Sequence, residues 1–424
     1  MAKEVMFTDT EINYNRVLKC AMDIGEHMLV SGIEAGKVED SISRICRAYG
    51  AFRVDALSIT TSIIVTIETP SGEVITQTRR ITNRTYDFMR IEALNRLSRI
   101  ICETRPDFDY IEDELHKIDG IKPLRCFWSA VAFILFASAF AVFFGGNFKD
   151  AVAAAIAGAV VFVFNRYATR LKSNRIVFNL LVSIITGAVC ILLVNIGIGQ
   201  NLNYIMIGVI MLLIPGMAMT GAIEDLIIGD TITGLLRLCE AIIAGCAIAA
   251  GFAVATYSLS AKELINLTGG ISQNGIIQLI TAFVSSGCYA LMLGMKRPKR
   301  ILTAGIGGFL GWGAYILMMQ LVPNDFGACF IAAAIGALYA QIMARVMRAP
   351  AMIFLVPAVI PLVPGRALFY TFSSFMHGAD DLVYSWGMTT LLEALAIALG
   401  MVVVLIAFTA IVATVRRINL RKKL

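Results

Sequence analysis

The chain has 424 residues, and its 58% hydrophobic content and mean hydropathy of +0.76 exclude an ordinary soluble protein. The formal charge is +6, but residues 1–123 sum to −4 and residues 124–424 to +10. The positive charge thus belongs to the apolar part, and it does not indicate nucleic-acid binding. Nine scattered cysteines without a CxxC pair and three histidines give no metal-ligand spacing, so we expect no metal and no cofactor.

The first 120 residues or so predict a soluble α/β domain. Helical periodicity covers residues 14–30, 38–49 and 87–102, and a short acidic helix is expected at 109–118. Strand signals cover residues 54–60, 62–68 and 74–78. Glu39 and Asp40 are spaced for ordinary helix salt bridges with the Ser43–Arg44 turn. No Ser/His/Asp set or metal cluster is evident, so we expect no enzyme activity.

From residue 124 the chain is apolar almost to its end. A membrane span needs about 20 apolar residues. On this basis the sequence predicts ten spans, at 125–144, 150–168, 176–196, 203–222, 234–257, 275–294, 301–321, 327–346, 351–374 and 385–412.

The distribution of lysine and arginine predicts how these spans are oriented. Cytoplasmic loops are rich in basic residues. Alternate connections, including the C-terminal end of the chain, hold 16 of them, whereas the opposite connections hold only Lys149 and Lys262. We therefore expect both termini, and the soluble domain, in the cytoplasm.

Two Pro-Gly breaks interrupt the fourth and ninth predicted spans. Pro215-Gly216 and Pro364-Gly365 lie 149 positions apart, each within apolar sequence. A backbone break in lipid is tolerated only against protein or a water-filled cavity, and matching breaks in two halves point to a transporter site. Because the fourth span runs inward and the ninth outward, we expect two inverted five-helix repeats whose breaks meet as the walls of one site.

Ionisable residues follow the first break. Asp225, Asp230, Arg237 and Glu240 are candidates for the substrate or proton pathway. Asp230 and Arg237 are seven apart on one helix face, and Arg237 can pair with Glu240. A charge within the membrane costs about 2.5–3.5 kcal/mol, which favours a function for it. The alternative is that residues 224–237 form a solvated connection whose charges mark the membrane interface.

The second break differs from the first. Pro357, Pro361 and Pro364 forbid a regular helix there. Arg366 directly follows Gly365, and a buried cation at an unwound stretch suits a carboxylate substrate. Asp381 and Glu393 follow as further pathway candidates. The alternative for Arg366 is a structural pair with Asp380 or Asp381.

Several stretches of the sequence resemble threonine/serine exporters. Residues 31–45, 76–81 and 94–99 are similar to the cytoplasmic part of that family. Ile214-Pro215-Gly216 with residues 229–237 is similar to its first membrane half, and residues 275–412 to its second. The resemblance implies a ten-helix inner-membrane exporter driven by the proton gradient. It also implies succinate as an alternative substrate, through relatives made of two polypeptides.

We therefore expect a polytopic α-helical membrane protein with a cytoplasmic α/β domain at 1–122, membrane repeats at 123–260 and 270–415, and a basic tail at 416–424. Its expected function is proton-coupled export of threonine or serine across a bacterial inner membrane. The alternatives are a dicarboxylate exporter and a membrane-anchored sensor or scaffold. The expected partners are a small-molecule substrate, protons and lipid, with no nucleic acid; a homo-oligomer is compatible with the sequence.

Overall fold

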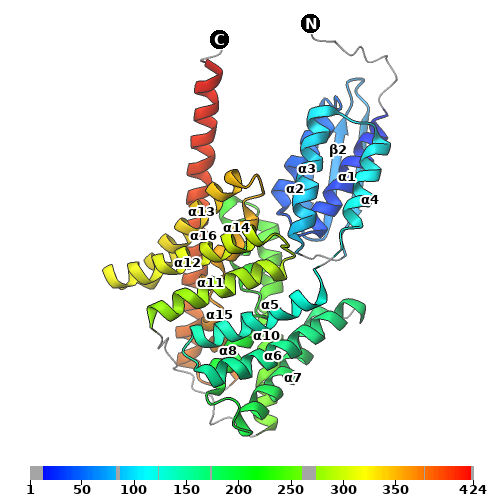
Figure 1. Cartoon of the computed structure of the whole chain (residues 1–424). Helices are drawn as coiled ribbons and strands as arrows, with labels where there is room; N and C mark the ends of the chain where they lie inside the picture. Colours follow the sequence, from blue (N-terminus) through cyan, green and yellow to red (C-terminus); the bar gives the residue numbers. More distant parts are fainter. Residues whose placement is uncertain are drawn as a thin grey trace. The chain divides into compact units, whose positions relative to one another are not determined.

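The structure is a computed structural model that describes residues 13–82, 86–122, 124–171, 174–259, 274–376 and 378–421 (Figure 1). Lys262 and the expected start of the second repeat at residue 270 lie outside these ranges, as do the last three residues of the expected basic tail. The chain forms two compact units, Met1–Pro123 and Leu124–Leu424. Each unit is described by itself.

The first unit contains a three-stranded antiparallel sheet in the order β1-β2-β3, with Ala56 of β1 opposite Val65 of β2 and Val65 opposite Gln77 of β3. The central strand alternates, and Ile63 and Ile67 are fully buried with Val65 on one face. Helices α1 and α2 pack against the sheet. The elements are α1 (Tyr14–Val30), α2 (Ala35–Ala48), β1 (Arg53–Ile59), β2 (Ser62–Glu68), β3 (Val74–Arg80), α3 (Phe88–Thr104) and α4 (Phe108–Asp119).

The acidic pair of α2 has separate structural roles. Arg44 forms an ion pair with Asp40 one turn earlier, at 2.9 Å and well exposed. Glu39 instead accepts a hydrogen bond from the backbone N–H of Ser58 on β1, at 2.6 Å. The predicted salt bridge at this spacing is therefore present, and the neighbouring carboxylate ties the helix to the sheet.

The second unit is helical and identifies the chain as a polytopic membrane protein. In the described residues, eight helices are long and apolar enough to span a membrane, and a ninth span is formed if Met352–Leu362 and Gly365–Phe375, bent by 49°, count as one. The helices are α5 (Cys126–Phe143), α6 (Phe148–Leu171), α7 (Arg175–Asn195), α8 (Leu202–Ile210), α9 (Gly216–Ile228), α10 (Thr231–Ser258), α11 (Gly275–Met292), α12 (Pro298–Leu321), α13 (Asp325–Val346), α14 (Met352–Val359), the 3₁₀ turn η2 (Ile360–Leu362), α15 (Gly365–Met376) and α16 (Asp380–Arg421).

Helix packing in the first half recurs in the second. Helix α5 packs on α6, α7 on α10 and α9 on α10; likewise α11 packs on α12, α13 on α16 and α15 on α16. Between the halves, α5 packs on α11, α9 on α16 and α10 on α15. Exchanging the two halves leaves this set of neighbours unchanged, as expected of two copies of one helix arrangement.

Two glycines at equivalent positions allow close contacts between the backbones of these helices. A Cβ added to Gly251 of α10 would lie 2.6 Å from the carbonyl oxygen of Leu180 on α7. One added to Gly400, 149 positions later on α16, would meet the backbone of α13 at the Phe330 carbonyl oxygen and the Ala334 nitrogen. Small residues of this kind let membrane helices approach closely.

Alanine at either glycine should therefore destabilise the membrane unit. The backbone of the facing helix cannot move aside as a flexible side chain can, so we expect Gly251→Ala and Gly400→Ala each to cost about 1–3 kcal/mol. Thermal unfolding of the purified protein in detergent measures this effect. Gly313→Ala is the control, because its added Cβ would lie 3.4 Å from the mobile end of Leu279. An unchanged unfolding temperature in both variants would contradict the packing.

Candidate functional site

The first break separates α8 from α9. Helix α8 ends at Ile210, and a turn over Met211–Leu213 leads to Pro215, which caps α9 at φ −79° and ψ 43°. Proline has no backbone N–H, so the helical hydrogen-bond ladder cannot continue through it. The predicted span 203–222 is thus two shorter helices, and it is absent from the eight or nine candidate spans.

The second break is longer than the first. Helix α14 ends at Val359, η2 forms one 3₁₀ turn, and Val363 is extended (φ −54°, ψ 131°) before α15 begins at Gly365. The prediction that all three prolines exclude a regular helix was wrong for Pro357, which lies inside α14. Membrane helices tolerate proline where neighbouring groups satisfy the freed backbone. Pro361 lies in the 3₁₀ turn, and Pro364 directly precedes α15.

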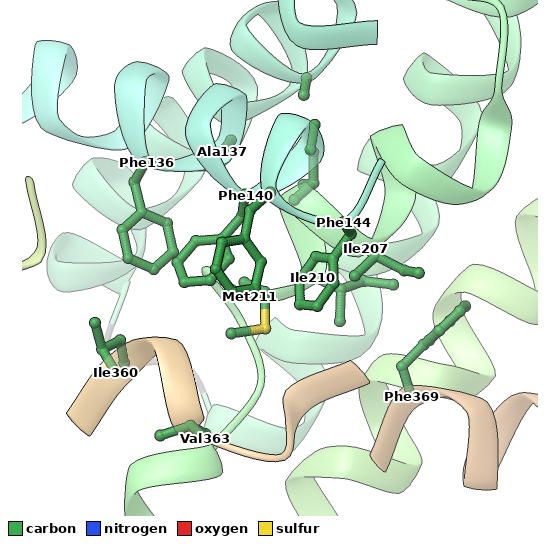
Figure 2. Packing of buried hydrophobic residues seen from close by; sticks show 14 of the residues in the cluster. Phe136, Ala137, Phe140, Phe144, Ile207, Ile210, Met211, Ile360, Val363 and Phe369 are labelled. Carbon is green, nitrogen blue, oxygen red and sulfur yellow. The ribbon is translucent and has the colours of Figure 1, made fainter. Parts of the chain in front are cut away.

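The two breaks touch each other. A Cβ added to Gly365 would lie 2.5 Å from the sulfur of Met211 and 3.7 Å from Ile214, both in the first break. Figure 2 shows the Met211 side chain between Phe140 of α5 and the second break at Ile360 and Val363. All of these except the partly buried Ile214 are buried. Two segments 149 residues apart therefore form one junction inside the membrane unit.

The first half holds a partly buried ion pair between the two helices that follow the first break. Arg237 Nη1 of α10 lies 2.7 Å from Asp225 Oδ2 of α9, and the two side chains are 14% and 12% exposed. Arg237 thus pairs with the preceding helix and not with Glu240, which is exposed on the outer surface of α10. Asp230 is the N-terminal flanking residue of α10 and only partly buried. The predicted pairing of Arg237 with Glu240 is replaced by the ion pair with Asp225.

Removing one member of this pair should lower the stability of the protein, because the other member remains as an unpaired charge at a mostly buried position. We expect Arg237→Gln to destabilise the protein by about 3–5 kcal/mol and the double variant with Asp225→Asn to recover part of that loss. Thermal unfolding measures the stability, and efflux of the double variant measures function. If the double variant is stable but inactive, the pair serves transport as well as structure; if it is no more stable than Arg237→Gln, the ion pair is not the cause.

The second half places a cation on an aromatic pair. The guanidinium carbon of Arg366 lies 5.4 Å from the ring centroid of Trp386 on α16. The same indole stacks on Tyr370 at 4.9 Å with an interplanar angle of 29°. Arg366 and Tyr370 are four residues apart on α15 and so share a helix face. Trp386 and Tyr370 were not predicted, because aromatic residues in an apolar helix give no distinct signal.

Glu393 lies on α16 beyond Trp386 and is partly buried. Arg366 is on α15, which packs against the helix of Glu393. Asp381 lies at the start of the same helix and is exposed, as is Asp380. The structure therefore places Arg366 and Glu393 on two helices that pack together, α15 and α16, and leaves Asp381 at a helix end.

The charged side chains and unwound turns of this region can bind a charged substrate or a proton. In the part of the chain that the structure describes, no group of three His, Cys, Asp or Glu side chains could hold a metal ion. Arg366 offers a guanidinium for a carboxylate, Glu393 a carboxylate for a cation or a proton, and the unwound turns offer backbone groups.

Two family models match successive parts of this chain. The model described as "Putative threonine/serine exporter" matches residues 19–259, more than half of the chain. The model described as "Threonine/Serine exporter, ThrE" matches residues 278–407. Together they cover the first unit and both halves of the membrane unit.

Two curated proteins are similar to this chain. A protein of Mycobacterium tuberculosis named "Probable threonine/serine exporter" is 26% identical over 421 residues, covering 94% of this chain and 77% of that protein. A protein of Klebsiella aerogenes named "Probable succinate transporter subunit YjjP" is 26% identical over 223 residues, covering 52% of this chain and 83% of that protein. No solved structure matches this chain.

Proposed function

Because the chain belongs to the threonine/serine exporter family, we propose that it exports threonine or serine across a bacterial inner membrane in exchange for protons. The family is one of transporters, so the membrane unit carries the activity and the chain is not an enzyme. Both termini lie in the cytoplasm in this proposal, as the distribution of basic residues predicts.

We further propose ten spans arranged as two inverted repeats. Helices α8 and α9 together form the fourth span in chain order, which brings the number of spans to ten. This span is interrupted at Pro215-Gly216, as the span formed by α14 and α15 is at Pro364-Gly365. The matched helix neighbours, the equivalent glycines and the contact between the two breaks support this arrangement. In such transporters the substrate binds at the breaks near the middle of the membrane.

The observation that carries the proposal is Arg366, which directly follows the second break and lies against Trp386 of α16, the helix that also carries Glu393. A zwitterionic amino acid has a carboxylate and an ammonium group on the same carbon. Arg366 binds the carboxylate, and Glu393 binds the ammonium, in this proposal. A proton on Glu393 removes its charge and so competes with the ammonium group. Competition of this kind makes proton binding and substrate binding mutually exclusive, which is the requirement for exchange.

The same pair argues against the alternative substrate. The Klebsiella relative carries a succinate transporter name, and succinate has two carboxylates but no cation. One carboxylate fits Arg366, whereas the second meets the like charge of Glu393, which is unfavourable at short range. We therefore favour a hydroxy amino acid over a dicarboxylate.

Reconstituted vesicles test the function directly. Vesicles containing the full chain are loaded with labelled threonine, serine or succinate, and the outside is acidified to different degrees. We expect efflux of threonine and serine to rise with the imposed gradient and to fall when a proton carrier collapses it. Efflux of threonine that ignores the gradient would remove proton coupling, and efflux of succinate alone would replace the substrate.

A further inference from the structure

Glu393 lies inside the apolar part of α16, 13 residues beyond its start at Asp380, which is about 20 Å at 1.5 Å per residue. If Glu393 exchanges protons, as the proposed function requires, a neighbouring group can pass an external proton to it. The helices packed against α16 are the places to look for such a group.

Helix α13 runs parallel to α16 and brings a second carboxylate beside Glu393. Gly400 faces Phe330 and Ala334, and eight residues later Phe408 lies under the guanidinium of Arg345, 3.9 Å away. Both contacts advance in the same direction along the two helices. Seven residues back from Gly400 is Glu393, and the corresponding stretch of α13 is its first turn, which begins at Asp325. Asp325 and Glu393 therefore lie at the same level of the two packed helices.

Asp325 is exposed and is held by a neighbouring tyrosine. The hydroxyl of Tyr315 on α12 donates a hydrogen bond of 2.9 Å to Asp325 Oδ1. Tyr315 is itself partly buried and interacts electrostatically with Glu393. Asp325 and Tyr315 therefore lie between an exposed helix end, on the outer side in the proposed topology, and the partly buried Glu393.

The repeat shows that the fold does not require these groups. The residue equivalent to Asp325 in the first half, 150 positions earlier, is Arg175 at the start of α7. The residue equivalent to Glu393, 149 positions earlier, is Ala244. Both halves pack alike without matching carboxylates, so the pair in the second half is available for a function outside the packing of the repeat.

We propose that Asp325 is the external proton acceptor that exchanges protons with Glu393, and that Tyr315 is the positioning residue that holds it. In this step an O–H bond breaks at Asp325 and one forms at Glu393, and no other bond changes. The proposal rests on the proposed proton-coupled exchange.

The groups around Glu393 suit this step. The charged and titratable groups that act on Glu393 and its neighbours are Arg366 from α15, Asp325 and Cys329 from α13 and Tyr315 from α12. Helix α9 also packs on α16, and its carboxylates are Glu224 and the ion-paired Asp225. Arg366 is the cation of this group, and Asp325 is the exposed carboxylate within it.

The test separates proton-driven efflux from exchange of threonine for threonine at equal pH, both in vesicles with the full chain. We expect Asp325→Asn to lower acid-driven efflux at least tenfold and to keep exchange within about twofold, because exchange needs no proton. Tyr315→Phe should also lower acid-driven efflux, by a smaller factor than Asp325→Asn, and should change the dependence of efflux on external pH. Asp380→Asn, an exposed carboxylate at the start of α16, is the control for Asp325. Tyr339→Phe is the control for Tyr315, because Tyr339 also donates one hydrogen bond between α13 and α12, to Thr303 at 2.7 Å.

The outcomes distinguish this inference from the proposed function. A wild-type protein without proton-driven efflux would overturn the proposed function itself. A coupled wild type whose Asp325→Asn and Tyr315→Phe variants keep its dependence on external pH would overturn the inference alone. Equal loss of efflux and exchange in both variants would also overturn it, because the residues would then be structural.

Discussion

Arg366→Gln should reduce threonine efflux by roughly 10- to 100-fold, mainly by raising the concentration of threonine needed inside the vesicle. Glutamine is similar in length and polar but carries no charge, so the substrate carboxylate loses a charge-assisted hydrogen bond worth about 1.5–3 kcal/mol. Arg366→Lys should recover only part of the loss, because lysine lacks the planar fork that binds both carboxylate oxygens. Initial rates of efflux, measured over a range of internal threonine concentrations, give the maximal rate and the threonine concentration at half of that rate.

Arg345→Gln is the matched control for this result. Arg345 also lies against an aromatic ring of α16, that of Phe408, but it is on α13 and away from both breaks. If the loss on changing Arg366 came only from a lost contact between an arginine and an aromatic residue of α16, the two variants should behave alike. We expect Arg345→Gln to keep the wild-type affinity for threonine, and a similar loss in both would remove Arg366 from the substrate site.

The breaks could be predicted from the sequence because their cause is local. Proline removes a backbone donor whatever surrounds it, and glycine at the start of α9 and α15 lets another segment approach. The same local reasoning failed at Pro357, where the helix continues. Whether a helix tolerates a proline depends on which groups satisfy the freed carbonyl, and these come from the tertiary structure.

The partners of the charged residues could not be predicted in the same way. Helix α10 is apolar on all sides, so hydrophobic periodicity does not show which of its faces is buried. It could therefore not be predicted that Arg237 lies toward α9 and that Glu240 lies on the outer surface. The pairing of Arg237 with Asp225 depends on how α9 and α10 are aligned after the break. Charge spacing along one helix carries no information on that alignment.

The two halves agree in packing but differ in chemistry. Arg237 of α10 and Trp386 of α16 are equivalent positions, 149 residues apart. Arg237 closes an ion pair with α9, whereas Trp386 supports the cation of α15. An ion pair already satisfied within the protein is a poor ligand for a substrate. Arg366 lies against an aromatic ring directly after the second break, so we expect substrate recognition in the second half.

Glu393→Gln should abolish the dependence of efflux on the proton gradient and lower efflux roughly 10- to 100-fold. Glutamine keeps the shape of glutamate but cannot take up a proton, and it loses the charge that binds the substrate ammonium. Glu393→Asp keeps the charge and should keep proton coupling at a reduced rate. Efflux measured over a series of external pH values, with the internal pH fixed, separates the two effects.

Glu240→Gln gives the comparison that tests the choice of carboxylate. Glu240 is exposed on the outer surface of α10, whereas Glu393 is partly buried on α16, the helix that packs against α15 with Arg366. A proton carrier must change its charge where the substrate binds, so we expect a smaller loss on changing Glu240 and a retained response to pH. A response to pH that survives Glu393→Gln but is lost in Glu240→Gln would transfer the proton-carrying role to the first half and separate it from the cation of Arg366.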